Sequence, residues 1–340
     1  MSKQNKTVLL VTPWDRNGGL ATYSGYLHDY LSEICDLDVH AWDHESIVSR
    51  GTGIRAISPN LFKKVNSVDN VHIQYTFGRY LLSLPIILIL SKFFGCNTVV
   101  TQHERFDNLP FSKPIWIYHQ IVYFLIDEII VHTEYRKQIV SSIHTSKTTV
   151  IEHGVIDRPS VTQSPREIDN IVIPGIIRPI KGYEYAIDAL QYIEDVTLRI
   201  VGNVDDDEYH KSLVEKSKEL EVNDRIDWDL RYIPESELFE IIKDADLILL
   251  PYNLDTSMSG ILSHCISWKN ITIVSDAPAL VNTIQCEHAV VKQNGETISQ
   301  RISELQSSPK MQLEILDKMS ELSKRYSWDH TAIKTKEKYK

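Results

Sequence analysis

The sequence predicts an α/β protein with two Rossmann-like domains, whose parallel sheets face each other across a cleft. Three observations favour this fold. The chain has 340 residues, whereas one domain usually has about 100–200. Short apolar runs, typical of strands buried on both faces, alternate with segments of helical spacing. Residues 157–168 (DRPSVTQSPREI) have the composition of a linker, so we expect domains at 1–160 and 165–325.

The first domain is expected to open with a buried strand at 7–11, a loop containing Gly18 and Gly19, and a helix at 20–31. A strand, a glycine loop and a helix form the opening unit of nucleotide-binding folds. The alternation continues with predicted strands at 71–74, 98–101, 128–132 and 148–152, and predicted helices at 81–93, 115–125 and 135–142.

The second domain repeats this alternation after the linker. Strands are predicted at 171–174, 197–201, 225–228, 247–251 and 271–275, and helices at 183–192, 209–220, 235–243 and 260–268. In sheets of this kind, ligands bind beyond the carboxyl ends of the strands. We therefore expect the functional residues in the loops that follow strands, facing the cleft.

The charge and the cysteines exclude several classes of function. The net charge is -10, and nucleic-acid binding needs a dense basic face, so no nucleic-acid partner is expected. The four cysteines, Cys35, Cys96, Cys265 and Cys286, are widely spaced and form no CxxC pair. This pattern predicts no metal site or redox motif and fits the reduced thiols of a cytoplasmic protein.

Two apolar stretches bear on the membrane question. The stretch at 81–90 (LLSLPIILIL) is short, and the stretch at 115–130 is interrupted by the polar residues His119, Asp127 and Glu128. A membrane-spanning helix needs about 20 apolar residues, so neither stretch is expected to cross a bilayer. We interpret both as buried helices, and the alternative is contact with one face of a membrane.

The glycine pair after the first strand is a candidate phosphate site. Gly18 and Gly19 would let the backbone approach a phosphate, while the helix that follows supplies amides. The alternative is a tight turn without a ligand. The dinucleotide fingerprint GxGxxG is absent from this loop.

Two cations follow the predicted strand at 171–174. Arg178 and Lys181 lie three residues apart in GIIRPIKG, directly before a predicted helix. Cations in this position can hold a diphosphate and stabilise the charge that grows on a departing nucleotide. The alternative is that both are solvated turn residues.

Ser259 and Gly260 open the predicted helix at 260–268, after a strand and a small polar loop. The free amides of a helix N-terminus form an anion site. The alternative is that Ser259 only caps the helix.

His103 follows the predicted strand at 98–101. A histidine at a strand exit can accept a hydrogen bond from a substrate hydroxyl or orient a sugar. The alternative is a loop histidine whose hydrogen bonds lie within the protein.

Together, these segments resemble the GT-B glycosyltransferases, specifically the large retaining family 4 (glycosyl transferases group 1). The resemblance covers nearly the whole chain. It rests on the GG loop, on VTQHE at 100–104, IVHTEY at 130–135, IEHGV at 151–155 and GIIRPIKG at 175–182, and on the YIP…ADLILLPY…SG block at 232–260. The closing segment, about 326–340, is similar to the family's last helix, which crosses back to the first domain.

The resemblance implies that the second domain binds the donor and the first domain binds the acceptor. The catalytic residues it implies are His103, Arg178 and Lys181. The donor-binding residues it implies are Gly18, Gly19, Arg178, Lys181, Arg231, Tyr232, Ile233, Ser259, Gly260, Ile261 and His264. It implies no metal and no cofactor, because protein cations and helix amides neutralise the diphosphate. Asp205, Asp206 and Asp207 are interpreted as a solvated loop.

The sequence departs from the family at its paired glutamates, whose positions correspond to Thr256 and His264. Relatives that carry IRPxKG and SG commonly lack the first glutamate and use the Ser-Gly amides instead. The second glutamate typically holds ribose hydroxyls. Whether His264 replaces it is left open by the sequence.

The function implied is that of a retaining, metal-independent hexosyltransferase that uses a UDP- or GDP-sugar. Its expected acceptor is a saccharide or lipid-linked saccharide, as in bacterial surface polysaccharide synthesis. We expect a cytoplasmic protein at the inner face of the membrane, with peripheral contact through the first domain. Two alternatives stay open: a catalytically silent GT-B subunit that binds a partner, motivated by Thr256, His264 and Trp268, and a nucleotide-sugar epimerase.

Overall fold

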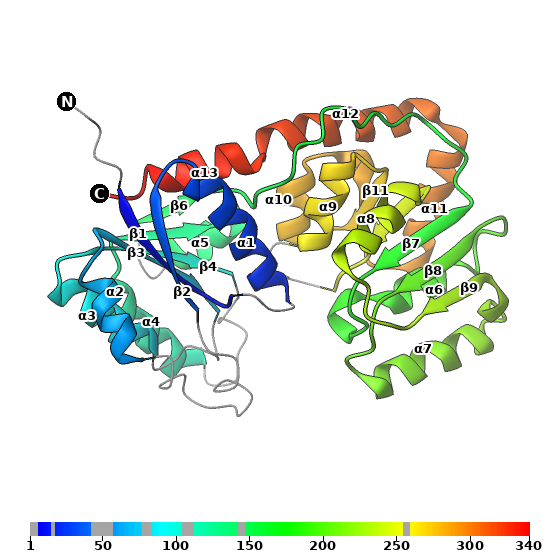
Figure 1. Cartoon of the computed structure of the whole chain (residues 1–340). Coiled ribbons are helices and arrows are strands. Elements are labelled where there is room, and N and C mark those ends of the chain that lie inside the picture. Colours follow the sequence, from blue (N-terminus) through cyan, green and yellow to red (C-terminus); the bar gives the residue numbers. More distant parts are fainter. Residues whose placement is uncertain are drawn as a thin grey trace. The chain divides into compact units, whose positions relative to one another are not determined.

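The computed structural model describes residues 6–14, 18–41, 57–76, 83–103, 112–141, 147–253 and 259–340, with only the backbone at 112–116. The chain divides into two compact units, Met1–Gly154 with Tyr326–Lys340, and Val155–Arg325. Each unit is built on a six-stranded sheet covered by helices (Figure 1). The predicted α/β fold with two Rossmann-like sheets is therefore confirmed.

The first sheet is parallel, with the strand order β2-β1-β3-β4-β5-β6. Its strands are β1 (Thr7–Thr12), β2 (Asp36–Ala41), β3 (Asn70–Tyr75), β4 (Asn97–Gln102), β5 (Glu128–Val131) and β6 (Thr148–Val150). The helices of this unit are α1 (Gly19–Ser32), α2 (Pro59–Val65), α3 (Ser83–Phe93), α4 (Ser112–Phe124), α5 (Glu134–Ser141) and α13 (Trp328–Lys336).

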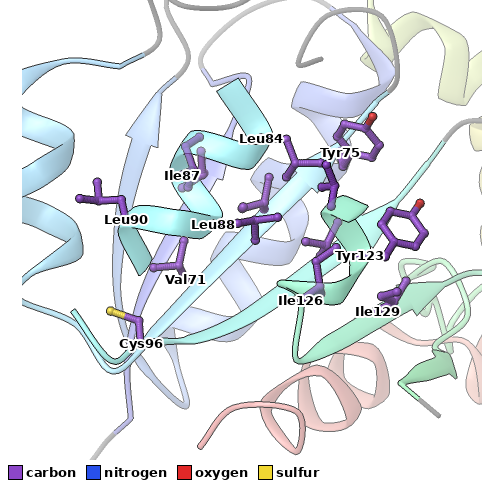
Figure 2. Close-up of a cluster of buried hydrophobic side chains, with 14 of the residues drawn as sticks. Val71, Tyr75, Leu84, Ile87, Leu88, Leu90, Cys96, Tyr123, Ile126 and Ile129 are labelled. Carbon is purple, nitrogen blue, oxygen red and sulfur yellow. The ribbon is translucent and has the colours of Figure 1, made fainter. Parts of the chain in front are cut away.

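The burial of each strand explains whether it could be predicted from the sequence. β3 and β4 are buried along their whole length, as strands covered on both faces are. The core between this sheet and its helices includes Tyr75 from β3, Leu88 from α3 and Tyr123 from α4 (Figure 2). The edge strand β2 (DLDVHA) was not predicted, because its exposed polar residues interrupt any apolar run.

The second sheet is also parallel, with the strand order β12-β11-β10-β7-β8-β9. Its strands are β7 (Asn170–Pro174), β8 (Thr197–Val201), β9 (Ile226–Asp229), β10 (Leu247–Leu250), β11 (Thr272–Ser275) and β12 (Val290–Val291). Its α-helices are α6 (Tyr183–Ala189), α7 (Asp207–Glu219), α8 (Glu235–Asp244), α9 (Gly260–Trp268), α10 (Pro278–Ile284), α11 (Gly295–Ser307) and α12 (Pro309–Arg325), with short 3-10 turns η2 (Pro179–Lys181), η3 (Asn223–Arg225) and η4 (Glu287–Ala289).

Each sheet has a point where its strand order reverses. In the first unit the reversal falls between β1 and β3, and in the second between β7 and β10. Open parallel sheets bind ligands at such points, outside the carboxyl ends of the strands. Ligand sites are therefore expected in the segments that follow β1 and β3 in one unit, and β7 and β10 in the other.

The helices are not of the membrane-spanning kind. Within the described ranges, none combines the length and the apolar content that crossing a bilayer requires.

Candidate functional site

In the second unit, the segments after β7 and β10 are joined by hydrogen bonds. The Asn253 amide N–H donates to the Ile180 carbonyl at 3.0 Å, and Asn253 Nδ2 donates to the Pro179 carbonyl at 2.8 Å. Gly182 follows at a φ of 66°, and a Cβ there would lie 2.1 Å from the Pro251 carbonyl oxygen. This turn needs glycine, which brings η2 onto the end of β10.

Tyr252 connects Lys181 with the start of α9. The Lys181 Nζ lies 3.6 Å from the centre of the Tyr252 ring, and the Tyr252 hydroxyl lies 3.2 Å from Ser259 Oγ. The tyrosine is fully buried, and its carbonyl accepts hydrogen bonds from Ser275 Oγ at 2.7 Å and Gln293 Nε2 at 3.0 Å. The ring face is negative and attracts the ammonium group. Lys181 is thus positioned without using a carboxylate.

Both cations after β7 are available to an anion. Arg178 is exposed and extended, with a φ of -159°. Across the part of the second unit that the structure describes, neither Arg178 nor Lys181 forms an ion pair. The structure brings Lys181 close to the α9 N-terminus through Tyr252, as the sequence could not show.

The N-terminus of α9 begins at a small residue, Gly260. Ser259 is buried and caps the helix, since its Oγ accepts from the Leu262 N–H at 3.3 Å. A Cβ at Gly260 would meet nothing within 4 Å. The first amides of a helix lack intrahelical partners, and among the described residues those of Gly260 and Ile261 have no other partner, so they can bind a ligand. The position of Thr256 lies outside the described residues.

His264 lies four residues after Gly260, where α9 packs on α8. Its ring centre is 5.0 Å from that of Phe239, and its Nε2 is 3.7 Å from Glu235 Oε1. Burial, and secondarily the charge of Arg158, lower the pKa of His264 to about 4. His264 is therefore a neutral side chain within the α8–α9 contact.

The loop after β9 contains the predicted base-binding residues. The Arg231 guanidinium donates to Asp229 at 2.8 Å and to Glu237 at 2.9 Å. Its positive charge is thus neutralised within the loop, in contrast to the charges of Arg178 and Lys181. Tyr232 is 58% exposed and Ile233 is half-buried, so both present apolar surface.

The aspartate run after β8 has a structural role. Asp206 caps α7, its carboxylate accepting from the Tyr209 N–H at 2.9 Å. Within the described ranges, no group of three or more histidine, cysteine, aspartate or glutamate side chains is arranged to hold a metal ion.

In the first unit, Gly18 and Gly19 begin α1 after β1. Gly18 has a φ of 140°, and a Cβ at either glycine would meet nothing within 4 Å. The free space and the helix N-terminus are what a bound phosphate or sugar requires. Residues 15–17 of this loop lie outside the described range.

His103 follows β4 and is held by a chain of buried side chains. Its Nε2 donates to Gln74 Oε1 at 2.8 Å, and Gln74 Nε2 lies 3.2 Å from His72 Nε2. The Nδ1 of His72 is 2.7 Å from the hydroxyl of Tyr339, near the end of the chain. This chain of hydrogen bonds was not predicted, although two polar residues at alternate positions of a buried strand, His72 and Gln74 of β3, indicate it.

The hydrogen bonds fix the tautomer of His103. Burial, together with the neighbouring His132 and His153, holds the pKa of His103 well below its usual value, so the ring is neutral at pH 7. An amide oxygen only accepts, so Nε2 carries the proton and Nδ1 keeps a lone pair. Among the described residues Nδ1 has no hydrogen-bond partner, so it can accept a hydrogen bond from a ligand hydroxyl.

An aromatic cluster surrounds this histidine. The Tyr23 ring of α1 lies edge-on to His103, with ring centres 4.8 Å apart, and 5.1 Å from the Trp328 ring of α13. A Cβ at Gly154 would lie 2.1 Å from the Trp328 ring. The closing helix therefore supports the same region of the first unit as His103.

Comparison with known proteins finds a family similarity in the second unit. Residues 160–322 match the family model described as Glycosyl transferases group 1. The cations after β7 and the N-terminus of α9 both lie within this matched region. No curated protein matches the chain in sequence.

Solved glycosyltransferase structures share the whole fold. A glycosyltransferase from Rickettsia africae has a TM-score of 0.77 at 17% identity, covering 98% of this chain and 97% of its own. The HepE protein of Anabaena, solved with UDP and glucose, has a TM-score of 0.74 at 13% identity, covering 98% and 99%. Sucrose-phosphate synthase from Thermosynechococcus elongatus has a TM-score of 0.72 at 15% identity, covering 98% of both chains. The predicted GT-B fold is thereby confirmed.

Proposed function

We propose that the protein transfers a sugar from a nucleotide-diphosphate sugar to a saccharide or lipid-linked saccharide acceptor. One observation carries the proposal. In the region that matches the glycosyl transferases group 1 family, two cations that have no carboxylate partner among the described residues follow β7, and Tyr252 joins one of them to the N-terminus of α9. The solved structures of similar fold include proteins bound to UDP or to UDP-glucose, and this supports a UDP-sugar, with a GDP-sugar as the other candidate.

In the proposed reaction, the bond between the sugar's anomeric carbon and the diphosphate oxygen breaks. The acceptor oxygen forms its bond to that carbon on the same face, and its proton passes to the departing phosphate. The configuration is therefore retained, and no side chain has to act as a base. Arg178, Lys181 and the α9 amides stabilise the departing diphosphate, because preorganised charges act where negative charge develops.

His103 orients the sugar in this proposal. Its Nδ1 accepts a hydrogen bond from a sugar hydroxyl, while Gln74 holds the proton on Nε2. Tyr232 and Ile233 supply apolar surface for the base, and Ile261 contributes an amide to the diphosphate. Gly18 and Gly19 give the donor room beside α1.

The setting proposed is bacterial surface polysaccharide synthesis, in the cytoplasm at the inner face of the membrane. A solved lipopolysaccharide outer core galactosyltransferase, WaaB, has a TM-score of 0.69 to this chain at 14% identity and supports this setting. The second candidate is a catalytically silent partner-binding subunit. It is favoured by the packing of His264 against Phe239, because the family's ribose-binding position here serves the α8–α9 contact.

Hydrolysis of the donor without an acceptor separates the two candidates. The protein is incubated with UDP- and GDP-sugars in excess EDTA, and released nucleoside diphosphate is measured. An enzyme releases it and a silent subunit does not. Because the proposal includes no metal, loss of release in EDTA with recovery on adding Mn²⁺ or Mg²⁺ would contradict that part of it.

The role of His103 predicts a change in pH dependence. In Gln74→Glu, the new carboxylate accepts from Nε2 as the amide does, but its negative charge raises the pKa of His103. The protonated ring loses the Nδ1 lone pair, so kcat/KM of the variant should fall as the pH is lowered, at a higher pH than in the wild type. Coincident pH profiles, with the thermal unfolding of both proteins unchanged, would remove Nδ1 from the mechanism.

A further inference from the structure

An exposed apolar face covers α3 and α4 in the first unit. It consists of Ile86, Ile89 and Phe93 of α3, which are 37%, 58% and 80% exposed, and Ile117, Ile121 and Phe124 of α4, which are 53%, 65% and 74% exposed. In each set, the second residue follows the first by three or four positions and the third follows the first by seven. All three therefore lie on one side of the helix.

The opposite sides of these helices form the core. Leu84, Leu88 and Tyr123 are buried in one cluster between the helices and the sheet (Figure 2). The two helices are therefore apolar on the side that faces the sheet and also on the side that faces solvent. Soluble proteins rarely leave large contiguous apolar surface exposed, so this face indicates an interaction site.

The charges around the apolar face indicate which kind of partner it contacts. By sequence, α2, α3 and α4 contain four lysines but no aspartate or glutamate, in a chain whose net charge is -10. The lysines whose side chains the structure describes are Lys63, Lys64 and Lys92. Lys64 and Lys92 pair with Asp38 and Asp127 on neighbouring elements, at 2.8 and 2.5 Å, while Lys63 is exposed. On an ordinary solvated surface, positively and negatively charged side chains are interspersed.

We infer that this apolar face inserts into the interface of an anionic phospholipid bilayer. Exposed Ile and Phe side chains bordered by lysine are the composition of a helix that lies in the membrane interface. Lysine beside the inserted residues suits anionic headgroups. This inference rests on the proposed function, because insertion of the face into the bilayer would bring the first unit to a lipid-linked acceptor.

Flotation with lipid vesicles tests the inference on the full chain. The wild type should float with vesicles that contain phosphatidylglycerol and less with phosphatidylcholine alone. The variant Ile89→Ser, Phe93→Ser, Phe124→Ser should lose at least about tenfold in lipid partitioning. A matched variant, Tyr192→Ser, Leu313→Ser, Ile333→Ser, removes side chains of similar exposure (59%, 45% and 50%) on other elements and should float like the wild type.

Three results would overturn the inference: a wild type that does not float, a face variant that floats equally well, or a wild type that sediments as a dimer where the face variant is a monomer. The last would make the face a contact between copies of this chain. Donor hydrolysis by the face variant without vesicles should equal that of the wild type. A failure to float with hydrolysis intact would reject the membrane surface and leave the proposed function standing.

Discussion

Replacing Lys181 by alanine is expected to lower kcat by about 10²–10³-fold while the protein stays folded. One preorganised charge at a developing anion is worth about 3–4 kcal/mol in the transition state. The one interaction that the Lys181 side chain makes among the described residues is its contact with the Tyr252 ring, and the substitution loses only the roughly 1 kcal/mol that this contact contributes to stability. The measurement is turnover of the nucleotide sugar, with thermal unfolding as the test of folding.

Two further variants sharpen this prediction. Arg178→Ala should lower kcat to a similar degree, and Lys181→Arg should also be impaired, because a planar guanidinium does not replace the compact point charge of an ammonium group at a tight phosphate site. The matched control is Lys218→Ala, which removes an exposed lysine in the last turn of α7 and should leave turnover unchanged. If Lys181→Ala turns over as fast as the Lys218 control, Lys181 has no part in the mechanism.

Gly260→Val is expected to weaken binding of the nucleoside diphosphate by about 100-fold. Beyond its own helix and chain neighbours, a Cβ at this position meets nothing within 4 Å among the described residues, so the valine should fit the folded chain and occupy the space where the diphosphate approaches. The loss of two charge-assisted hydrogen bonds, at about 1.5 kcal/mol each, gives a change of this size. Isothermal titration calorimetry measures the affinity directly.

Ser259→Ala is the comparison for this variant. It keeps the backbone amides but loses the cap on the Leu262 N–H and the contact with the Tyr252 hydroxyl. We expect a loss of about 2 kcal/mol in stability with only a small change in affinity. Gly260→Val that binds the nucleotide as tightly as the wild type would place the diphosphate elsewhere.

The elements that could be predicted from the sequence are those with the clearest pattern of apolar residues. Strands such as β7 and β10 are continuous apolar runs, because helices cover both faces of their sheet. The edge strands β2 and β12 and the helices α2 and α10 to α12 were not predicted. β2 has alternating polar residues, and α10 to α12 are amphipathic segments beyond the last predicted strand.

The site was harder to predict than the fold, because its arrangement depends on contacts between distant residues. Arg178 and Arg231 are equally basic in the sequence, yet Asp229 and Glu237 neutralise only Arg231. The support of Lys181 by Tyr252, and of His103 by Gln74, joins residues 71 and 29 positions apart in the chain, respectively. The strand order brings both pairs together: Lys181 and Tyr252 follow β7 and β10, which meet at the reversal point of the second sheet, and Gln74 and His103 lie on and directly after the neighbouring strands β3 and β4.

We expect the second unit to hold a nucleoside diphosphate between the Arg178–Lys181 turn and the α9 N-terminus. A thermal-shift titration with UDP, GDP, ADP and CMP measures this binding. A ligand at a hundredfold excess over its Kd stabilises the folded state by about 2.7 kcal/mol, which raises Tm by about 5–10 °C for a unit of this size. We predict such a rise with UDP or GDP for the wild type and a much smaller one for Gly260→Val. A wild-type Tm that moves with none of the four nucleotides, or an equal rise in the variant, would show that the diphosphate does not bind at this site.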